Sequence, residues 1–356
     1  MNERFRALSK RITRRIAAGL ACVSLSVSLF GCTDGVAASS EDIVKTEFFA
    51  MNTYMRIEVR GREAEAAVAA GREEVYRLER LFSRTDPKSE VSAINAAGTA
   101  WTEVSDETLL LIKTAIEYSK STGGAFDITV APVMDLWGFT DGHNRVPDED
   151  ELESVRALIG YDRIRIDEVG NRICMRSEGM SLDLGGIAKG YAGDRVLDII
   201  RGFDIEAILI SLGGNVSVYG RKPGGASYRV AIADPGNRQE YLGVLTADDT
   251  DVVTSGGYER FFEQDGKVYI HIMDPATARP AESDLRSVSV IDPDGLKGDV
   301  LSTALFVMGK DAAIKYWSER RDFGLVLAVS SDEVLVSRNL QGVFAVSEGK
   351  SVTYFD

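Results

Sequence analysis

The stretch at residues 181–196, SLDLGGIAKGYAGDRV, places a carboxylate, a glycine pair and a lysine around the start of a helical pattern. Asp183 precedes the glycine pair, and Lys189 falls in the first turn of a helix expected over residues 187–201. Unpaired N–H groups at a helix start and the positive end of the helix dipole attract anions. The spacing matches neither a Walker A loop nor a dinucleotide fingerprint. The stretch therefore fits an anion site, and it also fits a capped glycine turn with a solvated lysine.

A second stretch, LKGDVLSTALFVMG, brings three oxygen-bearing side chains into helical spacing. If a helix begins at Asp299, then Asp299, Ser302 and Thr303 share one face, because their spacing is i, i+3 and i+4. Mg²⁺ prefers such oxygen ligands and keeps some waters or phosphate oxygens around it. The alternative is that Asp299 caps the helix and that both hydroxyls bond back to the preceding turn.

His271 stands in the stretch KVYIHIMDPATARP, whose alternation predicts a strand with Tyr269, His271 and Met273 on one face. A histidine at a strand end beside Asp274 can accept a proton near neutral pH. A structural histidine with satisfied hydrogen bonds is the alternative. The other histidine, His143, lies in a polar loop.

Two further stretches fit the binding of a planar, phosphate-bearing ligand. GGAFDITVAPVMDLWGF offers Phe126 and Trp137 for stacking, although core packing explains the same aromatic residues. VVTSGGYERFF offers the hydroxyls of Thr254 and Ser255 and nearby N–H groups to phosphate oxygens, although a plain turn fits as well.

The remaining pattern predicts many strands and a few long helices. Helices are expected over residues 63–82, 108–122, 148–158, 187–201, 300–308 and 311–318. Strands are expected at 48–61, 163–175 as a hairpin, 180–184, 207–212, 216–220, 228–233, 243–245 and 251–255, in KVYIHIMDP and RSVSVIDPD, and near the end. This order favours an α+β fold with mixed, mostly antiparallel sheets and flanking helices over a doubly wound parallel sheet.

The first residues predict a targeting segment. A basic start and an apolar run precede Leu-Phe-Gly-Cys32, which resembles a bacterial lipobox whose cysteine is lipidated. We therefore expect a lipoprotein signal peptide over 1–31, a lipidated Cys32 with a flexible tether over 32–45, and one domain over 46–356. A plain signal peptide or signal anchor is the alternative. Removal of the leader would leave Cys174 as the one unmodified thiol, so no intramolecular disulfide is expected.

The net charge of the 356-residue chain is −14. An acidic surface repels nucleic-acid backbones, so we expect no nucleic-acid partner. An anionic small ligand would need a metal ion or a local cationic group.

These motifs, in this order, together with AMNTYMRIEV and SEVSAIN, resemble the ApbE family of FAD:protein FMN transferases over residues 48 to about 309. The resemblance implies an ApbE-like fold, FAD as substrate and Mg²⁺ as cofactor. Residues implied to bind FAD are Met51, Ala125, Phe126, Asp127, Asp183, Lys189 and His271, and we add Thr85, Thr254 and Ser255 as FAD-site candidates. Implied metal ligands are Asp299, Thr303, the carbonyl of Gly186 and, at a position that varies, Ser302. His271 is our candidate base, with Asp274 as the alternative.

The implied reaction transfers FMN to a Thr or Ser of an acceptor redox protein and releases AMP. Many members carry Gly where this chain has Asn52, and Tyr where it has Thr85. Because a Tyr ring there could stack on FAD and Thr85 cannot, an FAD pyrophosphatase that forms FMN and AMP is an alternative, as is a non-catalytic FAD-binding lipoprotein. The leader and the resemblance together predict an exported, membrane-anchored lipoprotein.

Overall fold

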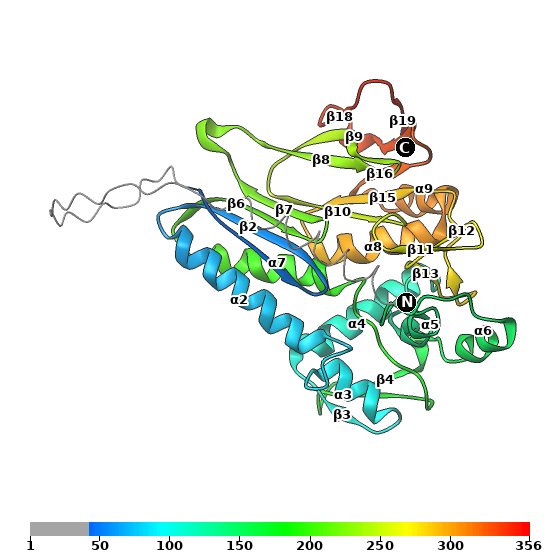
Figure 1. Ribbon diagram of the computed structural model, residues 1–356. Coiled ribbons are helices and arrows are strands. Elements are labelled where there is room, and N and C mark those ends of the chain that lie inside the picture. The colour runs from blue at the N-terminus through cyan, green and yellow to red at the C-terminus, as the bar shows by residue number, and fades with distance from the viewer. Residues whose placement is uncertain (1–42) are drawn as a thin grey trace, which may run out of the picture. The chain divides into compact units, whose positions relative to one another are not determined.

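The computed structural model describes residues 43–356 and centres on a nine-stranded sheet (Figure 1). The strand order is β1-β2-β6-β7-β10-β15-β16-β17-β19, and neighbours are antiparallel except for β17 and β19. The strands are β1 (Ile43–Ala50), β2 (Thr53–Gly61), β6 (Ile205–Leu212), β7 (Asn215–Gly220), β10 (Thr250–Gly256), β15 (Ser287–Asp292), β16 (Gly324–Ala328), β17 (Glu333–Ser337) and β19 (Ser351–Phe355).

Helices α2, α7 and α8 cover one face of this sheet (Figure 1). The α-helices of the described chain are α2 (Ala64–Phe82), α3 (Glu90–Ala97), α4 (Asp106–Ser121), α5 (Ala131–Leu136), α6 (Glu149–Arg156), α7 (Ala188–Ile200), α8 (Gly295–Met308) and α9 (Lys310–Ser318). The predicted α+β fold with mostly antiparallel sheets is confirmed.

The opposite face of the sheet carries a second core. Along β6, Ile208 and Ile210 are buried under the helices, whereas Ala207 and Leu209 belong to the other core, because successive strand residues point to opposite faces. A three-stranded sheet covers that second core and consists of β8 (Tyr228–Asp234), β9 (Asn237–Ala247) and β18 (Phe344–Val346).

Smaller sheets complete the described fold. One sheet has the order β3-β5-β4, and two hairpins follow β10 in the chain. Their strands are β3 (Thr102–Glu103), β4 (Ile164–Asp167), β5 (Arg172–Met175), β11 (Phe261–Gln264), β12 (Lys267–Ile270), β13 (Met273–Asp274) and β14 (Arg279–Pro280).

The single strand predicted at 48–61 is wrong, because two strands, β1 and β2, occupy this region. Their register pairs Ala50 with Thr53, which leaves Met51 and Asn52 as a two-residue turn. Both turn residues have positive φ, 47° and 60°, as a type I′ hairpin turn requires. Asn tolerates this conformation better than other non-glycine residues, but without glycine the turn gives a weak sequence signal.

The strand predicted at 180–184 is also wrong. This segment joins no sheet, because a side chain takes the place of a neighbouring strand. The Asn95 amide accepts a hydrogen bond from Leu182 N at 2.7 Å and donates one to Leu182 O at 3.0 Å. The next residue, Asp183, donates its N–H to Ile128 O at 2.7 Å. Helix α3, which carries Asn95, therefore fixes the approach to the glycine turn.

The predicted signal peptide, Cys32 and most of the predicted tether lie outside the described residues. Strand β1 begins at Ile43, so residues 43–45 of the expected tether belong to the sheet. Between residues 43 and 356, no helix has both the length and the apolar character needed to cross a bilayer.

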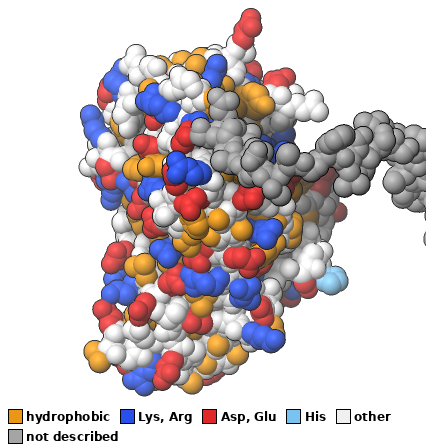
Figure 2. Space-filling model, turned by 90° about the vertical axis from the view of Figure 1, so that its left-hand side faces the viewer, with side chains coloured by type: hydrophobic (Ala, Val, Ile, Leu, Met, Phe, Trp, Pro, Cys, Tyr) orange, Lys and Arg blue, Asp and Glu red, His pale blue; other side chains and the backbone are white. Residues whose placement is uncertain are grey.

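Charges of both signs are interspersed over the face of the molecule in Figure 2. Acidic and basic side chains alternate there with apolar ones, and no single-sign patch dominates the view.

Candidate active site

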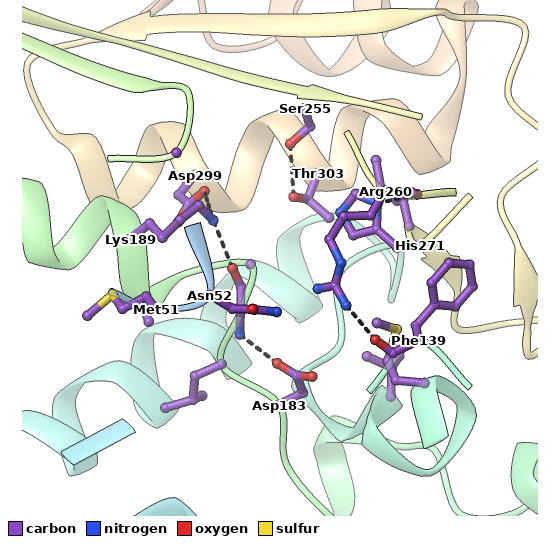
Figure 3. Close-up of a pocket in the computed structure, with 18 of the residues that line it drawn as sticks. Met51, Asn52, Phe139, Asp183, Lys189, Ser255, Arg260, His271, Asp299 and Thr303 are labelled. Atoms are coloured by element: carbon purple, nitrogen blue, oxygen red, sulfur yellow. Dashed lines mark hydrogen bonds and ion pairs between the residues drawn. The ribbon is translucent and has the colours of Figure 1, made fainter. Parts of the chain in front are cut away.

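A cavity of about 750 Å³ opens where α7, α8 and β10 meet the loops around residues 83–85 and 125–140. This volume is in the range of small-molecule and cofactor sites. Among the predicted FAD-site and metal-site residues, all but one line the cavity: Met51, Thr85, Ala125, Phe126, Asp127, Asp183, Gly186, Lys189, Thr254, Ser255, His271, Asp299 and Thr303. Chain segments far apart in sequence therefore converge on one site (Figure 3).

Asp183 holds the glycine turn rather than the start of α7. Its Oδ1 accepts a hydrogen bond from Gly185 N at 2.7 Å, and α7 has no side-chain cap. A Cβ on Gly186 would lie 3.0 Å from Phe126 Cε2 and 3.8 Å from Thr303 Oγ1, so the turn packs closely on both residues. The expected glycine bend is present, and the Asp183 carboxylate caps this turn and not α7.

The first N–H groups of α7 are mostly engaged by protein oxygens. Ile187 N and Ala188 N donate to Leu184 O at 3.0 and 2.9 Å, and Gly190 N donates to Asp299 Oδ2 at 2.9 Å. Lys189 Nζ donates to Gly185 O at 3.0 Å and lies 3.6 Å from Asp299 Oδ1. The attraction for an anion at this helix start therefore comes mainly from the Lys189 ammonium and the helix dipole.

Asp299 lies in the second turn of α8, whose N-cap is Asp294, so the interpretation of Asp299 as a cap is excluded. Asp299 is 97 % buried, and within residues 43–356 its Oδ1 has only the long contact to Lys189. Thr303 Oγ1 lies 3.2 Å from Ser255 Oγ, on the neighbouring strand β10 (Figure 3). The predicted face with i and i+4 oxygens is present in the cavity.

Ser302 is the predicted metal ligand that does not line the cavity. Its fully buried hydroxyl donates back to Asp299 O at 3.0 Å and lies 2.9 Å from Ser255 Oγ. Ser302 therefore holds Ser255 in place from the side that faces away from the cavity. For Ser302, the alternative that its hydroxyl bonds back to the preceding helical turn is correct.

The donor set fits a hard cation that keeps part of its own ligand shell. In the described chain no three His, Cys, Asp or Glu side chains are grouped to hold a metal ion. Asp299 and Thr303 offer one carboxylate and one hydroxyl beside the glycine turn that carries Gly186. Mg²⁺ suits such a set, because it commonly takes one or two carboxylates and completes its shell with water and substrate phosphate.

His271 lies between β12 and β13, so the predicted continuous strand is broken at this residue. The backbone N–H of His271 donates to Arg260 O at 3.0 Å, and the ring atom Nδ1 lies 3.1 Å from the same carbonyl oxygen. Burial lowers the pKa of His271 to about 4, and the charges of Arg260 and Lys189 act in the same direction. The ring is therefore neutral at pH 7, and a proton on Nδ1 leaves Nε2 free to accept another.

Asp274 does not reach the cavity. Its carboxylate accepts hydrogen bonds from Ala276 N and from the Thr277 hydroxyl, both at 2.9 Å, within the turn that follows β13. This geometry favours His271 over Asp274 as the proton acceptor.

Asp127 and Trp137, two residues that the sequence analysis named as site candidates, also have structural roles. Asp127 lines the cavity, but its carboxylate accepts bonds from Thr129 N at 2.8 Å and Tyr161 N at 2.9 Å, and burial raises its pKa. Trp137 is 99 % buried and donates its indole N–H to Ala278 O at 3.0 Å. The core alternative is therefore correct for Trp137, and Phe126 remains the ring beside the glycine turn.

Several polar residues that line the cavity were not singled out from the sequence, among them Arg84, Asn215 and Arg260. Arg84 Nη2 pairs with Asp135 at 2.7 Å, and its Nε lies 3.6 Å from Asp183 Oδ2. The guanidinium of Arg260 donates to Phe139 O (Figure 3). Arg260 stands inside the stretch VVTSGGYERFF and Arg84 stands next to Thr85, so adjacency was a signal for these two residues, whereas Asn215 lies outside the quoted stretches.

A lysine beside a glycine turn, a carboxylate and a hydroxyl that suit a hard cation, and a neutral histidine around one cavity fit an enzyme that acts on phosphate esters. The chain belongs to the ApbE family, whose sequence model matches residues 51–327. A FAD:protein FMN transferase of Klebsiella pneumoniae is 36 % identical over 267 residues, which cover 74 % of this chain and 82 % of that protein. A FAD:protein FMN transferase of Treponema pallidum is 34 % identical over 73 % of this chain and 77 % of that protein.

Solved structures agree with this assignment. The crystal structure of the ApbE protein from Thermotoga maritima has a TM-score of 0.76 and 35 % identity, and the match covers 86 % of this chain and 97 % of that one. The apo flavinyl transferase ApbE of Pseudomonas stutzeri has a TM-score of 0.73 and 28 % identity, over 86 % and 95 % of the two chains.

Proposed function

We propose that this protein is a Mg²⁺-dependent FAD:protein FMN transferase. The observation that carries the proposal is the convergence of Lys189, Asp299, Thr303 and His271, from distant segments, on one cavity. The names of the relatives and of the solved structures support the same activity.

The residues divide the work between binding and proton transfer. Lys189 would bind the diphosphate of FAD, while Asp299, Thr303 and the Gly186 carbonyl would hold Mg²⁺. The bound ion would supply neutralisation of diphosphate charge, which is the main requirement of phosphoryl-type transfer.

His271 would accept the proton of the acceptor hydroxyl at Nε2. The hydroxyl oxygen of a Thr or Ser then bonds to the FMN phosphorus, the bond from that phosphorus to the bridging oxygen breaks, and AMP leaves with the electron pair. A neutral imidazole suits this step, because only the unprotonated ring accepts a proton.

The decisive experiment incubates the mature protein with FAD and Mg²⁺, with and without a redox protein that carries the family's Asp-Gly-x-x-Gly-Ala-Thr/Ser acceptor motif. AMP release that depends on the acceptor, with an acceptor mass gain of one FMN, supports the transferase. Absence of AMP under all conditions would make the protein a binder and would overturn the proposal.

FAD hydrolysis to FMN and AMP is the second candidate, and the exposure of Thr85 favours it. This small side chain lines the cavity and is open to solvent, so water can reach the site from that side. AMP release at full rate without acceptor would establish the hydrolase.

We also propose that the chain is exported and anchored to a membrane through a lipid on Cys32. The basic and apolar start of the chain and the lipobox-like ending support this localisation. Membrane fractionation of the wild-type protein and of Cys32→Ser tests it: the variant should move to the soluble fraction, and an unchanged distribution would contradict the lipid anchor.

A further inference from the structure

Asn215 is a buried amide in the cavity wall that has no assigned role. It is the first residue of β7 and follows a turn in which Gly213 and Gly214 have φ of 61° and 100°. The residue is 93 % buried and lines the cavity, and its Nδ2 has no hydrogen-bond partner within residues 43–356. A buried donor without a partner costs stability, so its retention in a cavity wall indicates that a ligand satisfies it.

The packing of β7 on α7 places Asn215 beside Lys189. Asn215 and Ser217 point to the same face of β7, because they are two residues apart. Ser217 Oγ would lie 3.3 Å from a Cβ on Gly193, so Ser217 packs directly against α7. Both elements start at the cavity, and Lys189 precedes Gly193 by about one helical turn. The helical turn from Gly193 back to Lys189 and the two strand residues from Ser217 back to Asn215 span similar lengths. Because Ser217 packs against Gly193, Asn215 is at about the same height as Lys189.

The packing of β10 on α8 brings the same amide close to the proposed cation site. The β7–β10 register pairs Val216 with Val252, and its continuation by one residue sets Asn215 opposite Val253. A Cβ on Gly298 would lie 2.9 Å from Val253 Cγ2, so this part of β10 touches α8 immediately before Asp299. Asn215 therefore faces the space between Lys189 and Asp299.

We propose that the Asn215 amide donates a hydrogen bond to a phosphate oxygen of the bound dinucleotide, and this inference rests on the proposed function. No oxygen of residues 43–356 accepts a hydrogen bond from Asn215 Nδ2. Asp299 Oδ2 is bonded to Gly190 N, and Ser255 is bonded to Ser302 and Thr303. Lys189 is a donor and cannot satisfy another donor. An anionic oxygen held by Lys189 would supply the missing acceptor, and Asn215 is the uncharged partner of Lys189 in diphosphate binding.

The test measures binding by flavin fluorescence and calorimetry in wild type, Asn215→Ala and Asn215→Asp at fixed Mg²⁺. A lost hydrogen bond to a charged group corresponds to a roughly 10- to 100-fold rise in the Kd of FAD for Asn215→Ala. Asn215→Asp should weaken FAD binding further, because it replaces the donor by a negative charge. The matched controls are Asn237→Ala and Asn237→Asp, since Asn237 is exposed on β9, away from the cavity, and its Nδ2 donates to Glu240 Oε1 at 3.0 Å.

Riboflavin, which lacks phosphate, separates a phosphate contact from a general disturbance of the pocket. Its affinity, measured directly or by competition with FAD, should be the same in wild type and Asn215→Ala, and the melting temperature should not fall. Equal losses for riboflavin and FAD, or FAD affinity unchanged in both variants, would overturn the inference. Tighter Mg²⁺ binding by Asn215→Asp without nucleotide would also overturn it, because the oxygen of the amide would then face the cation. Failure of the wild type to bind FAD would instead refute the proposed function.

Discussion

The cavity has two regions that differ in how firmly the protein holds them. We call the cavity-lining Ser255, Asp299 and Thr303, together with Gly190 and Ser302 that support them from behind, the buried wall. Phe49 and Thr85 are the exposed rim. In the buried wall each polar side chain is tied to another element, for example Asp299 to α7 and Ser302 to β10. In the exposed rim, Phe49 is 65 % exposed, and the one hydrogen-bond partner of the Thr85 hydroxyl in the described part of the chain is the Ser83 hydroxyl, at 3.2 Å.

This difference fits the division of work in the proposed function. A cation and a diphosphate need donors and acceptors fixed before binding, since reorganisation of charged groups weakens electrostatic stabilisation. An acceptor protein must reach the same phosphorus from outside, so the rim has to remain open. The predictions below test this division in order of decreasing effect.

Asp299→Ala should cause the largest loss, because it removes the one carboxylate of the proposed cation site. We expect AMP release to fall at least about 10³-fold, and chelation of Mg²⁺ in the wild type to have a similar effect. Steady-state AMP release measures both. Asp311→Ala is the control, since that side chain is 94 % exposed on α9. Full activity after chelation would contradict a metal in the buried wall.

His271→Ala should lower AMP release about 10²-fold or more, because the variant lacks the proton acceptor. The pKa of His271 is lowered to about 4, so the wild-type ring stays neutral as the pH falls from 8 to 6. Protonation of His271 therefore causes no loss of activity between pH 8 and pH 6. The rate should fall through protonation of this ring only as the pH approaches 4. Rate profiles between pH 4 and 8 check this point. His143→Ala, with an 87 % exposed side chain, should behave as wild type, whereas a steep loss of activity near pH 6.5 that vanished in His271→Ala would contradict the buried, neutral ring.

The buried wall could be predicted from the sequence because helical spacing alone sets which residues share a face. Asp299 and Thr303 line the cavity together, as the i, i+4 pattern predicts, although α8 begins four residues earlier than Asp299. Along β6, the period of the strand likewise decides which of the two cores each apolar residue joins. Local periodicity is sufficient wherever one element determines the geometry.

Sequence reasoning failed where a distant side chain decides the outcome. The apolar alternation at 180–184 is typical of a strand, but the partner of Leu182 is the amide of Asn95, which is 87 positions away. Asp274 has the chemistry of a base, yet its local turn engages the carboxylate. The amide of Asn215 gave no signal at all, because its lack of a partner is visible only in three dimensions.

Asp251→Asn should stabilise the support of the buried wall. Asp251 is 97 % buried near the start of α8, its Oδ2 has no hydrogen-bond partner in the described chain, and burial raises its pKa to about 8. Burial likewise raises the pKa of Asp194, a neighbour on α7, to about 7. The folded protein therefore binds more protons than the unfolded chain, and the free energy of unfolding should fall as the pH rises from about 4 to about 8.

A neutral Asn keeps an oxygen for the Ser217 hydroxyl and removes this titration. Thermal melts at pH 5 and pH 8.5 measure the effect: the variant should melt a few degrees above the wild type at pH 8.5 and close to it at pH 5. A wild-type protein whose melting temperature does not depend on pH in this range would contradict the buried, neutral carboxyl. Asp248→Asn, at a half-exposed carboxylate bonded to Arg221, is the control and should not be stabilised at pH 8.5.

Thr85→Tyr should produce the smallest effect, because it adds one ring to the exposed rim without changing the buried wall. An aromatic contact beyond area burial contributes about 0.5–1.5 kcal/mol, so the Kd of FAD should fall roughly 2- to 10-fold. A ring at this position also covers the side of the cavity that is open to water, so the ratio of FMN transferred to FMN released should rise. Flavin fluorescence titration and acceptor mass measure the two quantities. Val169→Tyr adds the same ring at a fully exposed position that does not line the cavity and should change neither. An unchanged ratio with tighter FAD binding would mean that water reaches the phosphorus by another path, and the rim would then determine affinity alone.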